Sequence, residues 1–125
     1  MNLAFAQNFL SRFAQTAIAG DHAAHMNMIS KKVRLYGMPG FEAINYEDWS
    51  QQCAHEFAQG LMKSISYLGL EMKMETDTLI CVETHETIEA KDGTVNSHAL
   101  EIFIEREDDG EWRLVQERIL PMQTH

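Results

Sequence analysis

The amino-acid sequence predicts an α+β fold in which three N-terminal helices pack on a curved, mainly antiparallel β-sheet. Three observations support this prediction. Apolar residues recur at helical spacing in the first half of the chain, the period changes to two near residue 65, and three turn signals divide the second half. With 125 residues, the whole chain, 1–125, is expected to form one domain.

The first helix is predicted over residues 2–19, because one stripe collects Leu3, Ala6, Phe9, Leu10, Phe13, Ala14 and Ala17. Gly20 ends this helix, and Asp21 can cap a short second helix over residues 22–29. A short strand is expected at residues 33–36, before the break at residues 37–40. A third helix should begin at the N-cap Asn45 and end at Gly60.

Four strands are predicted at residues 65–74, 78–90, 94–107 and 111–120. Turns of three residues join them, and turn length fixes the register of a hairpin. This register places Met72 opposite Ile80 and Glu86 opposite His98. The face toward the helices should hold Leu68, Leu70, Met72, Ile80, Val82, Ile88, Leu100, Ile102, Ile104, Trp112 and Leu114, whereas Glu117 should lie on the opposite face.

Charge and composition exclude several classes of function. The formal net charge is −9, which opposes binding to nucleic acids and to anionic membrane surfaces. No apolar run approaches the roughly 20 residues of a membrane span, and the N-terminus lacks a secretory pattern. Two cysteines, Cys53 and Cys81, do not form a disulfide framework or a metal motif. A cytoplasmic location is therefore expected, with no metal and no cofactor.

Two short motifs accompany this order of elements: Ala-Gly-Asp at residues 19–21 and Gly-Glu-Trp-Arg-Leu-Val at residues 110–115. The pattern resembles the nuclear transport factor 2-like superfamily, in its branch of SnoaL-like cyclases and ketosteroid isomerases. The resemblance covers nearly the whole chain. It implies a cone-shaped fold with a cavity, and often a homodimer. Because the superfamily contains enzymes and proteins without chemistry, it implies no particular activity.

The sequence departs from the ketosteroid isomerase pattern at both catalytic positions. Phe13 stands where the resemblance implies a tyrosine of the oxyanion hole. Gly37 stands where it implies an aspartate base, or Tyr36 if the alignment shifts by one residue. Steroid isomerisation is therefore not expected.

The predicted register leaves a few polar residues on the apolar face, and Glu86 and His98 form a cross-strand pair there. A carboxylate that orients an imidazole makes a general base. Arg118 could hold an enolate or a substrate carboxylate, and Tyr36 could donate a hydroxyl. These four residues are the candidate catalytic group. The alternative is a pair solvated at the end of its hairpin, which is the commoner arrangement.

The wall of the expected pocket consists of mainly apolar residues on the helices, the Gly/Pro loop and the sheet. It comprises Phe13, Trp49, Met38, Phe41, Phe57, Met72, Thr84, Leu100, Ile102, Trp112 and Gln116. His22 and His25 are interpreted as solvated helix residues, because no third metal ligand accompanies them.

The outer face of the sheet carries a second prediction. The register points five apolar residues away from the helices: Tyr67, Cys81, Phe103, Val115 and Ile119. A contiguous apolar stripe of this kind is typical of an interface, so a homodimer through this face is expected.

Two functions remain open. One is an enzyme that moves a proton, closes a ring or eliminates a group on a small apolar carbonyl compound. The other is a ligand-binding or dimerisation module that acts with a partner protein. They differ in whether Glu86, His98, Arg118 and Gln116 converge in a closed cavity.

Overall fold

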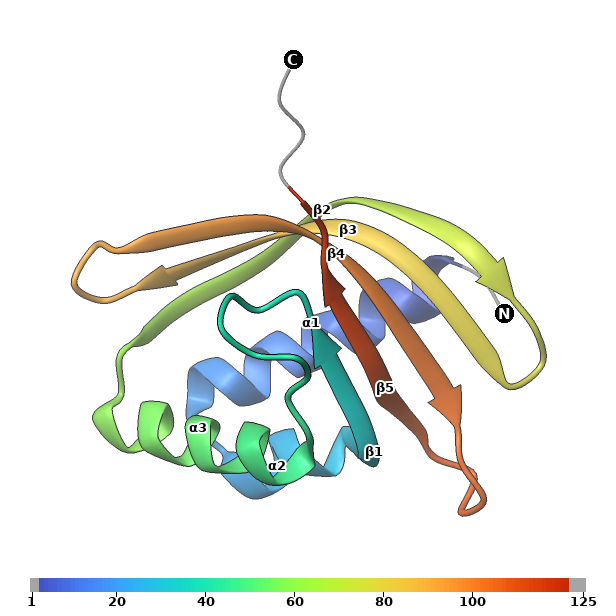
Figure 1. Ribbon diagram of the computed structural model, residues 1–125, viewed down its shortest axis with the longest axis horizontal. Coiled ribbons are helices and arrows are strands. Elements are labelled where there is room, and N and C mark those ends of the chain that lie inside the picture. The colour runs from blue at the N-terminus through green and yellow to red at the C-terminus, as the bar shows by residue number, and fades with distance from the viewer. Residues whose placement is uncertain (1–2, 122–125) are drawn as a thin grey trace.

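The structure is a computed structural model, and it describes residues 3–121 of the chain (Figure 1). The elements follow the order α1 (Leu3–Ala19), α2 (His22–Asn27), β1 (Ile29–Tyr36), α3 (Tyr46–Gln59), β2 (Met62–Glu75), β3 (Leu79–Ala90), β4 (Val95–Arg106) and β5 (Trp112–Ile119). The fold class is α+β, as the sequence predicts.

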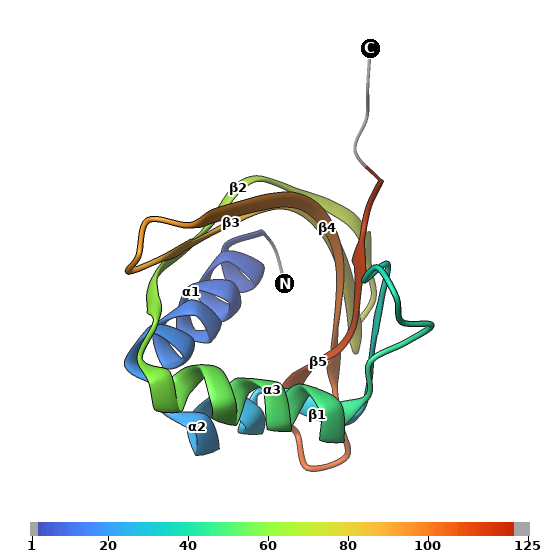
Figure 2. The same ribbon diagram turned by 60° about the vertical axis from the view of Figure 1, so that its left-hand side comes forward.

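The strands form one mixed sheet in the order β1-β5-β4-β3-β2. Three of its four pairings are antiparallel, and β1 pairs with β5 in parallel. The sheet arches over α1, and α3 lies across the open side of the arch (Figure 2). The concave face of the sheet therefore faces the helices.

Helix α1 supplies most of the helical part of the core. Its buried residues are Ala6, Phe9, Leu10, Phe13, Ala14 and Ala17, which are six of the seven residues in the predicted stripe. They pack against buried residues of the sheet such as Ile80, Ile102 and Leu114. The apolar period of 3.6 residues thus determines which face of this helix is buried.

The predicted capping residues act as expected. The side chain of Asp21 accepts a hydrogen bond from the backbone N–H of Ala24 at 3.1 Å, and Asn45 accepts one from Asp48 at 3.0 Å. Helix α3 ends at Gly60. These contacts satisfy N–H groups that have no partner inside a helix.

Helix α2 is shorter than predicted, and β1 is longer. The helix ends at Asn27 and the strand begins at Ile29, which the sequence assigned to the helix. The carbonyl of Met28 accepts a hydrogen bond from the N–H of Leu114 at 2.9 Å. Pairing with β5 therefore draws this segment into the sheet, and a tertiary contact overrides the local helical pattern.

The middle of the sheet follows the predicted register. Ile80 pairs with Ile104, Val82 with Ile102, Thr84 with Leu100, and Glu86 with His98. Strands β3 and β4 pair without a register shift over this whole length. Both faces of these two strands are consequently as predicted.

Strand β2 departs from the prediction because it contains a bulge. The register shifts between Leu68 and Glu71, where Gly69 has a φ of +69°. Glycine adopts this conformation without the strain that a side chain would add. Beyond the bulge, Tyr67 pairs with Glu86 and turns to the concave face, whereas Leu68 is exposed. The hairpin also places Met72 opposite Val82 rather than Ile80.

Strand β5 contains a second bulge, at Val115. Ile104 pairs with Leu114 and Phe103 with Gln116, so Val115 has no partner on β4. The next pairs are Ile102 with Glu117 and Glu101 with Arg118. An unpaired residue reverses the two faces of a strand from that point onward. Glu117 therefore lies on the concave face, and Arg118 lies on the outer face.

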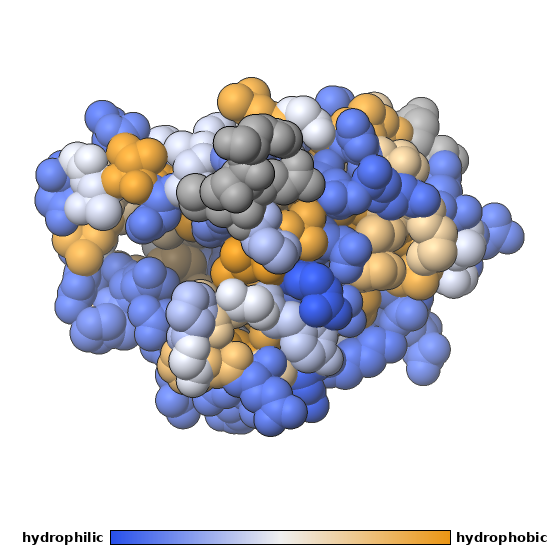
Figure 3. Space-filling view, turned by 45° about the horizontal axis from the view of Figure 1, so that its top comes forward, coloured by the Kyte–Doolittle hydropathy of each residue, from blue (hydrophilic) through white to orange (hydrophobic). Residues whose placement is uncertain are grey.

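These two bulges correct the predicted outer stripe. Tyr67 and Ile119 line the interior of the arch, whereas Cys81 and Phe103 face each other as predicted. In a view onto the upper face, apolar side chains lie in small groups among hydrophilic ones (Figure 3). Within residues 3–121, no helix is both long and apolar enough to cross a membrane.

Candidate functional site

A cavity of about 700 Å³ lies between the arch of the sheet and the helices. Its volume falls within the range usual for small-molecule sites. The lining residues come from every helix and from all five strands or their flanking loops: Phe13, Ala17, His25, Leu35, Met38, Phe41, Ile44, Asp48, Trp49, Gln51, Gln52, Cys53, Glu56, Met62, Ile65, Tyr67, Glu86, Ile88, His98, Glu117 and Ile119. Most of them are apolar.

The loop after β1 forms one side of the cavity mouth. Gly37 has a φ of +91°, and a Cβ atom at this position would lie 2.4 Å from the carbonyl oxygen of Ile119. Only glycine therefore lets the loop pass so close to the end of β5. The loop then places Met38 and Phe41 on the cavity wall, in agreement with the sequence prediction.

The Glu86–His98 pair forms part of the cavity wall. Glu86 Oε1 lies 3.0 Å from His98 Nε2, and the exposed fractions of the side chains are 9% and 27%. The hydrogen bond from Glu86 raises the pKa of His98 above its ordinary value of 6.5, although partial burial opposes this. With the Nε2 proton assigned to this bond, Nδ1 is the ring atom left to accept a proton.

Glu117 also lines the cavity, and only 7% of it is exposed. Burial, and then the nearby Glu86 carboxylate, raise the pKa of Glu117 well above its ordinary value. Burial therefore favours the protonated form of this carboxyl group. The sequence predicts Glu117 on the outer face. This is wrong because the bulge at Val115 reverses the faces of β5, and the residue types around Val115 give no signal of a bulge.

Tyr67 lies beside these two carboxyl groups. Its hydroxyl is buried, and its contact with the Glu86 carboxylate lies outside ordinary hydrogen-bond geometry. Burial raises the pKa of Tyr67 well above 10, and the neighbouring Glu86 and Glu117 carboxyl groups add to this effect. The signal for its inward position was Gly69, because an isolated glycine in a strand favours a bulge.

His25 is a buried residue, which corrects its interpretation as a solvated histidine. Its ring lies 4.3 Å from the ring of Phe13 and 5.4 Å from that of Phe57, measured between centroids. Its Nδ1 lies 2.8 Å from the Thr16 hydroxyl. Burial lowers the pKa of His25 to about 4, so the ring is neutral at pH 7. The helical spacing of His25, Met28 and Ile29 could have indicated this.

Two predicted catalytic residues lie outside the cavity lining. The Arg118 guanidinium stacks over the ring of Tyr36 at 4.9 Å, and its Nε lies 3.7 Å from Glu101 Oε1. Gln116, predicted to line the pocket, pairs with Phe103 on the outer face. The bulge at Val115 turns both Arg118 and Gln116 to the outer face. The ring of Tyr36 contacts the Arg118 guanidinium instead of lining the cavity.

Six further predicted wall residues belong to the core around the cavity rather than to its lining. Leu100 and Ile102 are fully buried, and the Thr84 hydroxyl donates a hydrogen bond to the Leu68 carbonyl at 2.9 Å. Met72 and Phe57 pack against the core. Trp112 contacts the ring of Phe5 at 5.1 Å, near the start of α1. Phe13 and Trp49 do line the cavity, as predicted.

The charge of the cavity wall is one-sided. Four carboxyl groups line it, from Asp48, Glu56, Glu86 and Glu117, and no lysine or arginine is found among its described residues. His98 is the residue that offsets part of this charge. No group of three or more His, Cys, Asp or Glu side chains within residues 3–121 is arranged to hold a metal ion.

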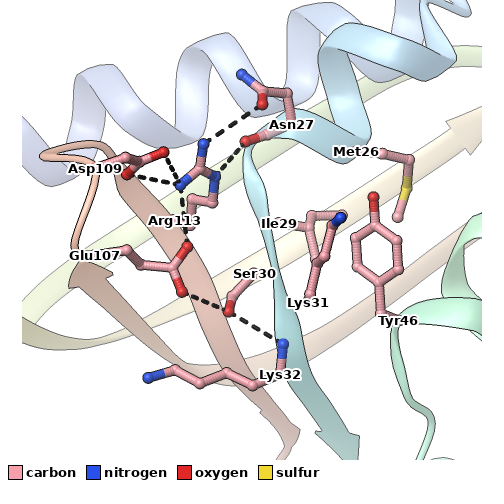
Figure 4. Close-up of a pocket in the computed structure, with 10 residues that line it drawn as sticks. All are labelled: Met26, Asn27, Ile29, Ser30, Lys31, Lys32, Tyr46, Glu107, Asp109 and Arg113. Atoms are coloured by element: carbon pink, nitrogen blue, oxygen red, sulfur yellow. Dashed lines mark hydrogen bonds and ion pairs between the residues drawn. The ribbon is translucent and has the colours of Figure 1, made fainter.

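A second cavity of about 420 Å³ lies at the other end of β1 (Figure 4). Arg113 dominates it. The Arg113 guanidinium donates to Asp109 at 2.9 Å, to Glu107 at 3.1 Å and to the Asn27 carbonyl at 2.9 Å. The Ser30 hydroxyl completes the network by donating to Glu107 at 2.7 Å. These groups join β1, β5 and the turn before β5.

Comparison with known proteins agrees with this architecture. A family model described as the SnoaL-like domain matches residues 6–119. The chain belongs to this family. No curated protein matches the sequence, so the SnoaL-like assignment carries no substrate with it.

Solved structures show the same fold at low sequence identity. An NTF-2 like protein of unknown function from Shewanella oneidensis is 13% identical, with a TM-score of 0.77 and coverage of 95% of this chain and 98% of that one. ActVI-ORFA from Streptomyces coelicolor is 13% identical, with a TM-score of 0.73 and coverage of 93% and 94%. A protein with a cystatin-like fold from Nostoc punctiforme is 14% identical, with a TM-score of 0.72 and coverage of 91% and 86%.

Proposed function

We propose that this SnoaL-like protein catalyses proton transfer on a small apolar carbonyl compound, as in an isomerisation, a cyclisation or a lyase step. The observation that carries the proposal is the Glu86–His98 pair, 3.0 Å apart, on the wall of a largely apolar cavity of about 700 Å³. A base in such a site is oriented by its carboxylate partner, and the apolar wall favours an apolar substrate beside it.

The proposed step uses the side chains of the cavity. The neutral imidazole of His98 accepts the proton from the carbon next to the carbonyl, at Nδ1. The electron pair of the broken C–H bond moves onto the carbonyl oxygen, which gives an enolate. Glu86 stabilises the resulting imidazolium through the Nε2–H bond. Return of the proton to the same or another carbon completes an exchange or an isomerisation.

The test is exchange of carbon-bound hydrogen for deuterium in D₂O, followed by NMR, with phenylacetone and 2-tetralone as probes. Both have an apolar ring and an acidic C–H group beside a carbonyl. We expect the protein to accelerate exchange at least tenfold over buffer, and His98→Gln to abolish this acceleration. The rate should rise with pH through a value above 6.5, because His98 must lose its proton first.

The matched control is His85→Gln. His85 is an exposed neighbour on the opposite face of β3, where its Nε2 lies 2.7 Å from the Ser97 hydroxyl. This variant should keep the wild-type exchange rate. If both probes occupy the cavity and neither exchanges, or if His98→Gln retains the rate, the catalytic proposal fails. A non-catalytic ligand-binding module then remains.

We also propose that two copies of the chain associate through the outer face of the sheet. Phe103 lies there opposite Cys81, which is itself buried within the chain, and Met74 adds a side chain that is 39% exposed. Apolar side chains that lie across neighbouring strands are typical of such an interface. Sedimentation should give twice the 14.3 kDa of the chain, and Phe103→Glu should give monomers. A wild-type monomer at micromolar concentration would contradict this proposal.

A further inference from the structure

The free edge of strand β2 borders a groove that the proposed catalysis does not use. β2 is the last strand of the sheet, so one of its edges has no neighbouring strand within residues 3–121. Helix α1 packs against β2 under the arch (Figure 2). Between the two elements lies a hollow of about 380 Å³, which is lined by residues 7–18 of α1 and residues 65–70 of β2. We call it the α1–β2 groove.

The edge of β2 is a template for hydrogen bonds. An edge strand turns a row of N–H and C=O groups away from its sheet, and an extended peptide can pair with them as an added strand. The bulge at Gly69 interrupts this row. A bulge at an edge disfavours long and unselective strand pairing. The edge along the groove is therefore suited to a short segment.

The helical wall of the groove matches the repeat of an extended chain. Three polar side chains of α1 follow one another at intervals of four residues along the groove: Gln7, Ser11 and Gln15. Four helical residues rise about 6 Å, and two residues of a strand rise about 6.6 Å. Each of these side chains can therefore meet every second residue of a strand beside β2. Both walls are about 17 Å long, which is the length of roughly five extended residues.

The charge of the groove limits what it can hold. No charged side chain lines it among the described residues, although 23% of the chain is charged and the net charge is −9. Leu10 and Ala14 form an apolar floor, and Ile18 and Leu68 are exposed apolar residues at the rims. A charged side chain would lose hydration there without gaining an ion partner. Charge complementarity therefore favours an uncharged segment.

We infer that the α1–β2 groove binds a short, extended and uncharged segment of a partner protein, which adds a strand to the edge of β2. The backbone of the segment pairs with β2, and its alternate side chains pack on Leu10 and Ala14. This inference concerns a protein partner, so it goes beyond the proposed catalysis and does not depend on the Glu86–His98 pair.

The edge strands of a second copy fit the groove less well than such a segment. β1, the other edge strand of the sheet, carries Lys31, Lys32 and Arg34 among its eight residues. β2 carries Lys63 and Glu71 on either side of the stretch that lines the groove. Pairing with either strand would bring charged side chains to the uncharged walls. A partner of different sequence is therefore the occupant that the charges favour.

The test selects ligands from a phage-displayed library of random heptapeptides on the immobilised full chain. Enriched peptides should contain few Asp, Glu, Lys or Arg residues and should alternate apolar with small polar residues, as a strand with one packed face requires. The most enriched peptide is then synthesised, and calorimetry measures its affinity. In its presence, hydrogen–deuterium exchange should slow at residues 65–70, because strand pairing protects amide N–H groups.

Ser11→Arg places a charge in the groove from an exposed position on α1. It should weaken binding of the synthetic peptide about tenfold, because the new charge opposes an uncharged segment. The matched control is Val95→Arg, at a residue of β4 that is 56% exposed and lies outside the groove. This variant should bind the peptide as the wild type does. Both variants should unfold at the wild-type temperature, since both residues are on the surface.

Backbone methylation of the peptide tests the pairing itself. Two analogues carry N-methyl groups at alternate residues, one in each phase, so that each loses the N–H donors of one edge. The two analogues should differ at least tenfold in affinity, because only one edge of the segment pairs with β2. Equal affinity would mean that the peptide adheres through its side chains alone, and the added strand would be wrong.

Three further results would overturn the inference: no peptide that prefers the wild type to Ser11→Arg, enrichment of charged peptides, or exchange protection outside β2. A dimer that becomes a monomer in Ser11→Arg would assign the groove to a second copy instead. None of these measurements involves turnover. Failure of the proposed catalysis on 2-tetralone therefore leaves this inference standing, and failure of peptide binding leaves the catalysis standing.

Discussion

The two cavities of this protein differ in how far their polar groups are paired within the protein. In the Arg113 cavity, the guanidinium contacts two carboxylates and a backbone carbonyl at 2.9–3.1 Å. In the central cavity, the Tyr67 hydroxyl meets the Glu86 carboxylate only outside ordinary hydrogen-bond geometry, and the wall contains no arginine or lysine among its described residues. The first arrangement is complete within the protein, and the second is not.

This difference suggests different roles. Paired polar groups hold elements together, and here they tie the end of α2 and the start of β1 to the turn before β5. Unpaired buried groups reduce stability and persist at sites that bind something else. We therefore expect changes in the Arg113 cavity to lower stability without affecting ligand binding, whereas the buried titratable groups of the central cavity make stability depend on pH.

The largest expected effect is on the pH dependence of stability, and it comes from His25 in the central cavity. The pKa of His25 is about 4 in the folded protein against 6.5 ordinarily. Between these values the unfolded chain binds more protons, so stability falls as pH falls from 6.5 to 4, by on the order of 3 kcal/mol. Urea unfolding at pH 7, 5 and 4 measures this loss.

His25→Gln should flatten this pH dependence, because it removes the titrating ring. The Arg113 cavity should contribute little over the same range, since hydrogen bonding to the Glu111 backbone and to Arg113 keeps the pKa of Asp109 below 3.8. An equal pH dependence of stability in His25→Gln and in the wild type would show that the His25 ring is not its cause.

The second effect is the loss of Arg113. Arg113→Ala should destabilise the fold by about 2 kcal/mol, because it leaves the Glu107 carboxylate and the Asn27 carbonyl without their shared donor. Thermal unfolding measures the change, and Arg106→Ala, at an exposed position on β4, should have little effect. Affinity for 2-tetralone should stay within about twofold in both variants. A stability like that of Arg106→Ala would show that the network is not structural.

The third and smallest effect has the opposite sign. Glu117→Gln should stabilise the protein at pH 8 by about 1 kcal/mol, because burial disfavours the ionised carboxylate that the unfolded chain adopts at this pH. The gain should shrink as pH falls and vanish below the ordinary pKa of 4.5. A destabilised Glu117→Gln at pH 8 would mean that the wild-type carboxyl is ionised and paired.

The sequence predicted most of the fold because its periodic patterns and caps are strong. The stripe of α1, the capping residues Asp21 and Asn45, and the regular pairing of β3 with β4 are as predicted. The Glu86–His98 contact follows from that pairing. It was predictable because the turn between these two strands fixes their register without any bulge.

The rest of the site depends on the two bulged strands. Alternation of side chains is a rule of period two, and one unpaired residue reverses it. Tyr67 beyond Gly69, and Glu117 and Ile119 beyond Val115, consequently lie inside rather than outside. Gly69 gave a local signal for its bulge. Val115 gave none, because valine is typical of a regular strand.

The bulge at Val115 has a consequence for how such proteins change their ligands. A regular β5 would turn Gln116 and Arg118 toward the cavity and Glu117 toward solvent, without a single substitution in the sequence. The wall would then carry a guanidinium in place of a buried carboxyl, and it would favour anions over neutral molecules. A one-residue change in strand pairing can therefore invert the electrostatic preference of the binding site.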